Sequence, residues 1–229
     1  ISSSGVAFAP INQFFADSDG RIHCFCNAWA NKWHLMGVML SAGSALRWYK
    51  TQFTPQLSYQ DMSKIASQAP AGSEGLLFLP YLNGERTPHS DPYAKGVFFG
   101  FSMRHQQAHF IRSLMEGISF GILDSVELIK SSGIDIKRIK IFGGAGKSKL
   151  WLQIMSDIIN DTICLNQEVE EPAFGAALIA GLGTNCFSHD SILNRKRTPD
   201  EYVFPSSNAR LYAELYPMYK DLYSHMFQS

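Results

Sequence analysis

The chain has 229 residues, of which 45% are hydrophobic and 13% aromatic, and its 20 basic and 20 acidic side chains give a net charge of +0. Such a composition can bury a sizeable core, which excludes a disordered tail and a collagen-like rod. The balanced charge argues against nucleic acid as the main partner, because phosphate backbones select a basic excess.

The start of the chain and its cysteines bear on where the protein works. No basic segment followed by an apolar one opens the sequence, so we expect no signal peptide in it. Ile1 lies in what reads as the middle of a strand, and we expect the chain to be a piece of a longer protein. No C-x-x-C pair is present, which argues against a zinc site, and sparse thiols favour a reducing cytoplasm. Cys24 and Cys26, two apart on a predicted strand, are expected to be small core residues.

Three short runs rich in aromatic and aliphatic residues open the chain, at residues 4–9, 21–28 and 33–40. Turn-like and polar residues separate them, namely Asp17-Ser18-Asp19-Gly20 and Asn31-Lys32. This spacing predicts a three-stranded antiparallel meander.

Two helices and an irregular loop are predicted next. Residues 41–44 begin a helix that runs to about residue 53, and Ser58 is placed to cap a second helix over residues 58–68. A buried strand follows at residues 76–79. Residues 80–95 contain three prolines, so they cannot be regular for long and have the character of a functional loop.

A long helix is predicted over residues 109–130, where apolar residues recur at helical spacing. On it, Ser113, Gly117, Gly121 and Ser125 form a row of small residues four apart. Charged residues share the same helix, so a membrane-spanning interpretation fails. Close packing against a neighbouring element is the better account of this row.

The remaining pattern alternates between strands and helices. It predicts strands at residues 138–142 and 162–165, and helices at residues 148–159, 172–182 and 208–227. Pro217 lies inside the last helix and should kink or break it. Strands that lead, followed by strands and helices in alternation, indicate an α/β domain with a mixed sheet and helices on both faces.

The sharpest local feature is the segment Ile-Phe-Gly-Gly-Ala-Gly-Lys-Ser at residues 141–148. A strand that enters a glycine-rich turn and leaves into a helix is a common cradle for phosphate or nucleotide. A P-loop would need glycine at position 141, which is Ile141, so that interpretation is rejected. A glycine turn that binds no ligand remains the alternative for the motif taken alone.

Several longer motifs occur together with this turn. They are Trp-His-Leu-Met at residues 33–36, Gly-Glu-Arg-Thr-Pro-His at residues 84–89, Lys-Gly-Val-Phe-Phe-Gly at residues 95–100 and Glu-Glu-Pro-Ala-Phe-Gly-Ala-Ala at residues 170–177. In this order they make the chain resemble the C-terminal domain of the FGGY-family carbohydrate kinases, most closely those that act on xylulose. The resemblance extends from the first strand to about Gly183.

The resemblance implies a ribonuclease-H-like (actin-like ATPase) fold and places residues 1–229 in a single nucleotide-binding domain. It implies ATP and Mg²⁺ as cofactors and phosphorylation of D-xylulose to D-xylulose 5-phosphate. The sugar, and an aspartate that takes the proton from its hydroxyl, are expected on an N-terminal domain upstream of Ile1. The isolated chain is therefore expected to be inactive. Family members often form homodimers, although no dimer interface is legible in this sequence.

The same resemblance suggests which residues bind the nucleotide. Gly143, Gly144 and Ala145 match the adenosine motif, where absent side chains let the ligand lie against the backbone. Ser148 either reaches the nucleotide or only caps the following helix.

A second stretch, Gly43 and Ser44, matches the adenine side. Arg47 one turn later is equally a base contact or a surface arginine. Ser3 and Ser4 lie in a degenerate phosphate motif, in which Ser2 replaces the usual glycine and restricts the backbone.

Other residues are expected to have supporting roles. Glu171 and residues 174–177 are interpreted as structural support beneath the nucleotide. Glu85 and Arg86 are expected to form a salt bridge that holds the proline-rich loop, with a place at the edge of the cleft as the alternative. His89 is not expected to act as an acid or base, because nothing near it in sequence would orient it.

Two other functions stay open on sequence grounds. One is a non-catalytic binding module with the same actin-like fold. The other is a sister kinase that acts on a different sugar, such as gluconate or glycerol.

Overall fold

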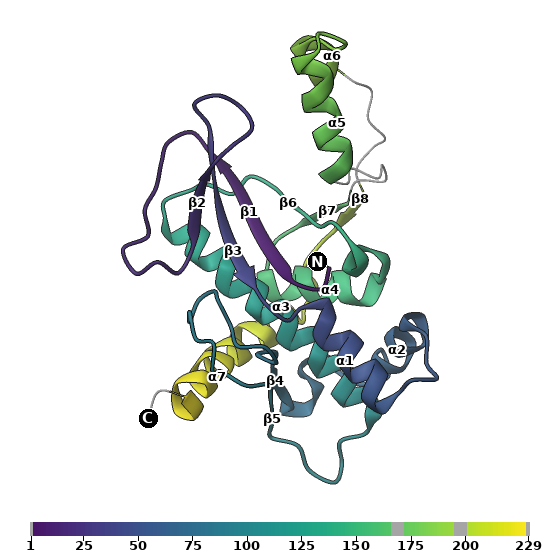
Figure 1. The fold of residues 1–229 in the computed structure, drawn as a ribbon. Coiled ribbons are helices and arrows are strands. Elements are labelled where there is room, and N and C mark those ends of the chain that lie inside the picture. Colours follow the sequence, from purple (N-terminus) through teal and green to yellow (C-terminus); the bar gives the residue numbers. More distant parts are fainter. Residues whose placement is uncertain (1, 166–171, 195–200, 228–229) are drawn as a thin grey trace.

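The computed structural model describes residues 2–165, 172–194 and 201–227, and Figure 1 shows its ribbon. The strands are β1 (Gly5–Ile11), β2 (His23–Cys26), β3 (Trp33–Met39), β4 (Leu77–Leu79), β5 (Val97–Phe99), β6 (Ile139–Lys140), β7 (Ile163–Leu165) and β8 (Glu201–Val203). The helices are α1 (Gly43–Phe53), α2 (Tyr59–Ala66), α3 (Gln107–Ser131), α4 (Lys149–Ile159), α5 (Pro172–Gly183), α6 (His189–Leu193) and α7 (Ala209–Phe227). Two 3₁₀ turns are η1 (Ala71–Gly75) and η2 (Gly144–Lys147).

The helix starts predicted from capping residues are confirmed. Ser58 precedes α2, and its hydroxyl accepts a hydrogen bond from the Asp61 N–H (3.1 Å). The Asp61 carboxylate accepts in return from the Ser58 N–H (3.0 Å), which completes a capping box. The Ser148 hydroxyl caps α4 by accepting a hydrogen bond from the Trp151 N–H (3.2 Å). These starts are set by bonds within one helical turn, so the local sequence predicts them.

The first sheet has the strand order β1-β3-β2. All its pairs are antiparallel, as predicted, but the order is not that of a meander, because β1 pairs with β3 along its whole length. β3 takes the middle place because it carries the most buried side chains of the three, with Leu35 and Met39 at 0% exposure. Residues 12–22 connect β1 to β2, and this connection is long enough for β2 to lie on the far side of β3 from β1.

β2 is consequently an edge strand. Cys26 is exposed, so the expectation of a core residue is wrong for it. Cys24 is half-buried and packs against the small cluster of Ile22, Leu35 and Ile129, so the expectation holds for it in part. β4 and β5 form a separate antiparallel pair, and the third sheet joins β6 and β7 in parallel with an antiparallel β8. The described part of the chain therefore has the expected α/β class, with its strands divided among three small sheets.

The long helix α3 organises the core. It lies against β1, β3 and β4 on one side and against α2 and α4 on the other, and it is central in Figure 1. Its row of small residues faces the strands: a Cβ added to Gly117 would collide with the carbonyl oxygen of Phe78, and one added to Gly121 would collide with the Met39 side chain. The predicted close packing is thus confirmed.

A buried carboxylate ties α3 to η1 and α7. Glu116 accepts hydrogen bonds from the Gly72 N–H (2.9 Å), the Ser73 hydroxyl (2.7 Å), the Arg112 guanidinium (2.8 Å) and the Tyr212 hydroxyl (2.7 Å). Four donors satisfy this buried charge, which would otherwise be costly. They also hold η1 at residues whose φ is positive, +74° at Gly72 and +48° at Ser73.

The last helix closes the core with tyrosines. Tyr212, Tyr219 and Tyr223 of α7 are all buried, and the Tyr219 ring lies 5.1 Å from that of Phe120 on α3. Pro217 lies within α7, which continues across it, so of the two predicted outcomes the break does not occur, and the kink remains a prediction. None of the helices in the described ranges has both the length and the apolar character that crossing a membrane requires.

The packing of α3 gives a stability prediction. Gly117→Ala should lower the free energy of unfolding by about 1–3 kcal/mol, because the new methyl meets a backbone carbonyl that cannot move freely. Gly175→Ala is the matched control, since its Cβ on α5 would meet nothing within 4 Å and alanine favours a helix. Urea denaturation measures both. Equal stability of Gly117→Ala and the unsubstituted chain would contradict the packing described here.

Candidate functional site

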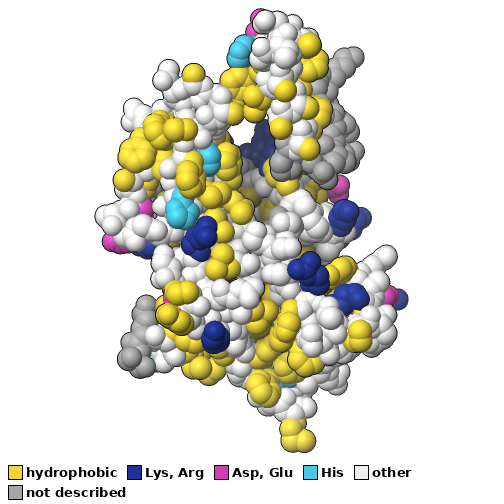
Figure 2. All heavy atoms as spheres, viewed as in Figure 1, with side chains coloured by type: hydrophobic (Ala, Val, Ile, Leu, Met, Phe, Trp, Pro, Cys, Tyr) yellow, Lys and Arg dark blue, Asp and Glu magenta, His cyan; other side chains and the backbone are white. Residues whose placement is uncertain are grey.

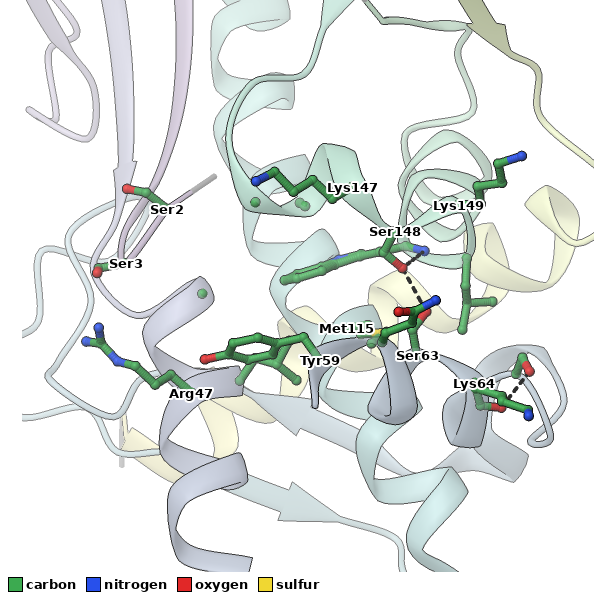
Figure 3. Close-up of a pocket in the computed structure, with 18 residues that line it drawn as sticks. Ser2, Ser3, Arg47, Tyr59, Ser63, Lys64, Met115, Lys147, Ser148 and Lys149 are labelled. Atoms are coloured by element: carbon green, nitrogen blue, oxygen red, sulfur yellow. Dashed lines mark hydrogen bonds between the residues drawn. The ribbon is translucent and has the colours of Figure 1, made fainter. Parts of the chain in front are cut away.

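A cleft of about 1020 Å³ opens where segments far apart in sequence meet. Its walls come from the chain start, α1, α2, η2 and the start of α4, and Met115 of α3 reaches it from below (Figure 3). The lining residues are Ser2, Ser3, Gly43, Leu46, Arg47, Tyr59, Gln60, Ser63, Lys64, Ser67, Met115, Gly144, Ala145, Lys147, Ser148, Lys149, Leu150 and Trp151.

The glycine turn forms one wall. Gly143 has φ +87°, a left-handed conformation that favours glycine. The backbone conformation alone therefore accounts for a glycine at this position. Gly144 is different, because its φ is ordinary and a Cβ there would meet nothing within 4 Å. The missing side chain of Gly144 leaves open space in the cleft. Ala145 beside it is buried, at 1% exposure.

Ser148 joins two walls of the cleft. Besides capping α4, its hydroxyl lies 2.8 Å from the Ser63 hydroxyl of α2, and the two are hydrogen-bonded (Figure 3). Of the two roles predicted for Ser148, the helix cap is confirmed. Its contact with a nucleotide remains a prediction.

The N-terminus of α1 is closed by the start of the chain. The Gly43 N–H donates to the Ser2 carbonyl (2.9 Å), and the N–H groups of Ala42 and Ser44 donate to the Ser3 carbonyl (3.1 and 3.0 Å). The Ser44 hydroxyl also donates to Ser3 (2.8 Å). A Cβ on Gly43 would collide with the Ser2 carbonyl, so close approach explains this glycine. These donors are used inside the protein rather than offered to a ligand.

The charge of the cleft is one-sided. Four of its lining residues are basic and none is acidic; the basic ones are Arg47, Lys64, Lys147 and Lys149. No ion pair joins any of them to a carboxylate within the described ranges. In Figure 2, basic side chains lie across the middle of this face and acidic ones lie toward its edges. Figure 3 shows Lys147 directed toward Ser2 and Ser3, whereas Lys149 points away from them.

The structure brings most of the predicted binding residues together. Those that line the cleft are Ser3, Gly43, Arg47, Gly144, Ala145 and Ser148. Three others, Ser4, Ser44 and Gly143, do not line it. Their neighbours do, so they are supports of the walls.

Sequence reasoning missed the wall that α2 provides. Tyr59, Ser63 and Ser67 lie four residues apart, which places them on one face of the helix, and all three line the cleft. The sequence signal that could have identified this wall is that one face of α2 is polar and carries an aromatic residue. Nothing in the local sequence of α2 shows that this face meets η2, because the two are about 80 residues apart in the chain.

The segment expected to support the nucleotide from below lies elsewhere. Residues 174–177 belong to α5, which in Figure 1 extends beyond β7 and β8 and away from the first sheet, and none of residues 173–183 lines the cleft. The expected supporting role is therefore not seen for these residues. Glu171 lies outside the described residues.

The proline-rich loop also lies outside the cleft. Glu85 is buried at 2% exposure, and its Oε1 accepts from the N–H groups of Leu40 (2.9 Å) and Arg86 (2.7 Å). The expected Glu85–Arg86 salt bridge is wrong, because backbone amides rather than the guanidinium hold the carboxyl. His89 does have orienting partners: it stacks on Tyr223 at 3.4 Å, and its Nε2 lies 3.2 Å from the Tyr81 hydroxyl. Burial lowers the pKa of His89 to about 4.

Two buried carboxyl groups, one in this loop and one on α3, have raised pKa values. Burial raises the pKa of Glu85 to about 7, and the charge of Asp124 contributes to the shift. Burial also raises the pKa of Asp124 to about 7, although its Oδ1 accepts a hydrogen bond from the Tyr216 hydroxyl (2.6 Å). Neither carboxyl lines the cleft, so both bear on stability rather than directly on ligand binding.

Comparison with known proteins shows which sequences and folds this chain resembles. The C-terminal-domain model of the FGGY family of carbohydrate kinases matches residues 14–184. The xylulose kinase of Staphylococcus xylosus is 36% identical over 225 residues, which are 97% of this chain and 47% of that protein. The chain spans about half the length of the relatives it matches.

Solved structures agree with the sequence comparison. A xyloylose kinase from Brucella ovis superposes with a TM-score of 0.88 at 30% identity, covering 98% of this chain and 46% of that one. A gluconate kinase from Lactobacillus acidophilus gives a TM-score of 0.89 at 28% identity, covering 99% and 46%. These likenesses confirm the predicted ribonuclease-H-like (actin-like ATPase) fold class.

The buried carboxyls predict how stability depends on pH. Unfolded, Glu85 and Asp124 lose their protons near pH 4, whereas in the folded protein they keep them up to about pH 7. At these two carboxyls the folded state therefore binds more protons between these values, so their contribution to the free energy of unfolding should fall as pH rises from 5 to 8. His89, whose pKa burial lowers to about 4, acts in the opposite direction below its unfolded pKa of about 6.5, so the net fall should be clearest from pH 6.5 to 8. For Glu85 alone the loss is on the order of 3 kcal/mol. Urea titrations at several pH values measure it.

Substitutions separate the contribution of these two carboxyls to the pH dependence of stability from that of the other titratable groups. Glu85→Gln and Asp124→Asn should each flatten the pH dependence, because an amide imitates the neutral carboxyl. Asp61→Asn is the control: hydrogen bonds from Ser58 lower the pKa of Asp61, so it stays ionised throughout this range. Stability that rises from pH 6.5 to 8 in the unsubstituted chain would contradict the argument.

Proposed function

The chain belongs to the FGGY family of carbohydrate kinases, and we propose that it is the nucleotide-binding half of an ATP-dependent kinase that phosphorylates D-xylulose to D-xylulose 5-phosphate. The observation that carries the proposal is the cleft with four basic and no acidic lining residues. In a chain with equal numbers of acidic and basic side chains, such a concentration of one sign favours an anionic ligand.

The two ends of the cleft suit the two ends of a nucleotide. Tyr59, Met115 and Trp151 give one part an aromatic and apolar lining suited to a base. Lys147 and Ser3 give the other part a cation and a hydroxyl suited to phosphates, with Arg47 close by (Figure 3). We therefore expect the base over Tyr59 and the phosphates toward Ser3.

Gly144 supports the same placement. Its backbone does not require glycine and its Cβ would enter open space, so the protein's own packing does not account for the residue. A ligand lying flat against residues 144 and 145 would account for it, because a side chain there would keep the ligand away. This observation is independent of the charge of the cleft.

The proposed reaction is transfer of a phosphoryl group. A hydroxyl oxygen of the sugar attacks the γ-phosphorus of ATP, the bond from that phosphorus to the β–γ bridging oxygen breaks, and ADP leaves. The hydroxyl proton goes to a base that we expect outside this chain. Such transfers depend chiefly on positioning and charge neutralisation, which Lys147 and Arg47 would supply here.

Mg²⁺ fits the described cleft poorly. Proteins usually hold this ion with one or two carboxylates together with substrate phosphates, and no carboxylate lines the cleft. Within the described ranges, no group of three or more His, Cys, Asp or Glu residues is arranged to hold a metal. The lining of this cleft therefore offers Mg²⁺ no acidic ligand.

A kinase for gluconate is the second candidate. The gluconate kinase of known structure is as similar in fold as the xyloylose kinase, so the fold does not separate the two sugars. The choice of D-xylulose rests on the sequence, through the 36% identical xylulose kinase and the motif at residues 84–89.

Nucleotide binding gives the first test. Calorimetric titration of the chain with ADP should show weak binding, and Gly144→Ala should weaken it about tenfold by filling the space for the ligand. Gly146→Ala is the matched control, because its Cβ would also be nearly free of contacts but Gly146 does not line this cleft. Equal weakening by both variants, or no binding by the unsubstituted chain, would contradict the proposal.

The substrate needs a separate test. A coupled assay on the whole protein that contains this chain should give ADP formation with D-xylulose at a higher kcat/KM than with gluconate or glycerol. The 229-residue chain alone should give none, because the sugar site and the base are expected elsewhere. A preference for gluconate would establish the second candidate instead, and D-xylulose-dependent turnover by the chain alone would overturn the division of roles.

A further inference from the structure

Residues 83–87 lie outside the cleft but hold the segment that leads into it. The Thr87 N–H donates to the Val38 carbonyl (3.0 Å), and the Thr87 Oγ1 accepts from the Val38 N–H (3.0 Å). Two residues earlier in the loop, the Glu85 Oε1 accepts from the Leu40 N–H (2.9 Å). The loop thus follows β3 to its end and continues along the turn toward α1.

The turn held by this loop passes directly into the cleft wall. Leu40 is three residues before Gly43, whose N–H donates to the Ser2 carbonyl (2.9 Å). The neighbouring Ala42 N–H donates to the Ser3 carbonyl (3.1 Å). A displacement of Leu40 would therefore move Ala42 and Gly43, and through their hydrogen bonds it would move Ser2 and Ser3. These residues are at the end of the cleft where we propose that the phosphates bind.

We infer that Glu85 is a positioning residue for the cleft: by binding the Leu40 N–H it fixes the β3–α1 turn and, through that turn, the wall formed by Gly43, Ser2 and Ser3. This role rests on the proposed function, because it concerns how well the cleft is preorganised for a nucleotide. Glu85 itself does not line the cleft and touches no ligand there.

The second oxygen of Glu85 makes the role sensitive to pH. Its Oε2 is buried without a hydrogen-bond partner. The charged or titratable groups that act on the carboxyl are Asp124 from α3, Tyr219 from α7, and Tyr81 and Arg86 from its own loop. Burial raises the pKa of Glu85 to about 7. Ionisation would place a charge on this unpaired buried oxygen, which is costly. A carboxylate also accepts a stronger hydrogen bond from the Leu40 N–H, but only while it stays in place; where the cost of burial draws the carboxylate toward water, the bond to Leu40 is lost.

Binding of ADP to the 229-residue chain tests the inference. Glu85→Ala, which leaves the Leu40 N–H without its acceptor, should weaken ADP binding about tenfold at pH 6. Glu85→Gln keeps a carbonyl oxygen as acceptor and should stay within about threefold of the unsubstituted chain at pH 6. From pH 6 to 8 the unsubstituted chain should lose affinity relative to Glu85→Gln. Comparing the two at each pH cancels the titration of the ligand's own phosphates.

Glu116→Ala is the control for general loss of stability. Glu116 is as buried as Glu85, at 3% exposure, but it holds η1 instead of the turn into α1. Glu116→Ala should lower the free energy of unfolding. At a temperature where this variant is folded, its ADP affinity should stay within about twofold of that of the unsubstituted chain. If Glu85→Ala does not fold, the pH comparison with Glu85→Gln decides alone. ADP affinity unaffected by Glu85→Ala, or an identical pH profile in Glu85→Gln, would overturn the inference.

Hydrogen exchange separates this inference from the proposed function. If the unsubstituted chain does not bind ADP, the proposed function fails, but the positioning claim can still be read from the amides of Ala42, Gly43 and Ser44. These should exchange faster in Glu85→Ala than in Glu116→Ala, because only the first variant releases the turn. Equal exchange in the two variants would overturn the positioning role.

Discussion

The first amides of α1 donate to the carbonyl oxygens of Ser2 and Ser3, and the shape of the cleft depends on this contact. The approach is close enough that a Cβ on Gly43 would collide with the Ser2 carbonyl. It also uses the donors that a helix N-terminus could otherwise offer to an anion. Under the proposed function, anion binding at this place would fall to side chains, above all Lys147 and Arg47, and to the backbone of η2.

Charge and space in the cleft point to the same kind of ligand. The basic side chains gather without acidic partners in the lining, although the chain as a whole is neutral. In the described part of the chain, a Cβ on Gly144 would meet nothing within 4 Å, which leaves space in the cleft. Ser148 lines the same cleft, and its hydroxyl links the walls made by α2 and α4. A flat ring that continues into a charged phosphate chain satisfies both properties, and this is the form of a nucleotide.

Features set within a few residues were predictable from the sequence. The cap at Ser58 and the close packing of Gly117 follow from local bonding and from helical periodicity. Features set by distant contacts were not: β1 pairs with β3 instead of β2, and Tyr59 lines the same cleft as the glycine turn. Glu85 was expected to pair with its neighbour, yet its carboxyl binds the N–H of Leu40, 45 residues away. Predicting each of these features would have required knowing which segments meet in space.

The central claim is that this cleft binds a nucleotide between η2 and α2. Titrating the isotope-labelled chain with ADP and following its backbone amides by NMR tests it most directly. The claim predicts that the largest shifts occur at Gly144, Ala145 and Ser148 on one wall and at Tyr59 and Ser63 on the other. Shifts that avoid both walls, or a spectrum unchanged by ADP, would contradict it.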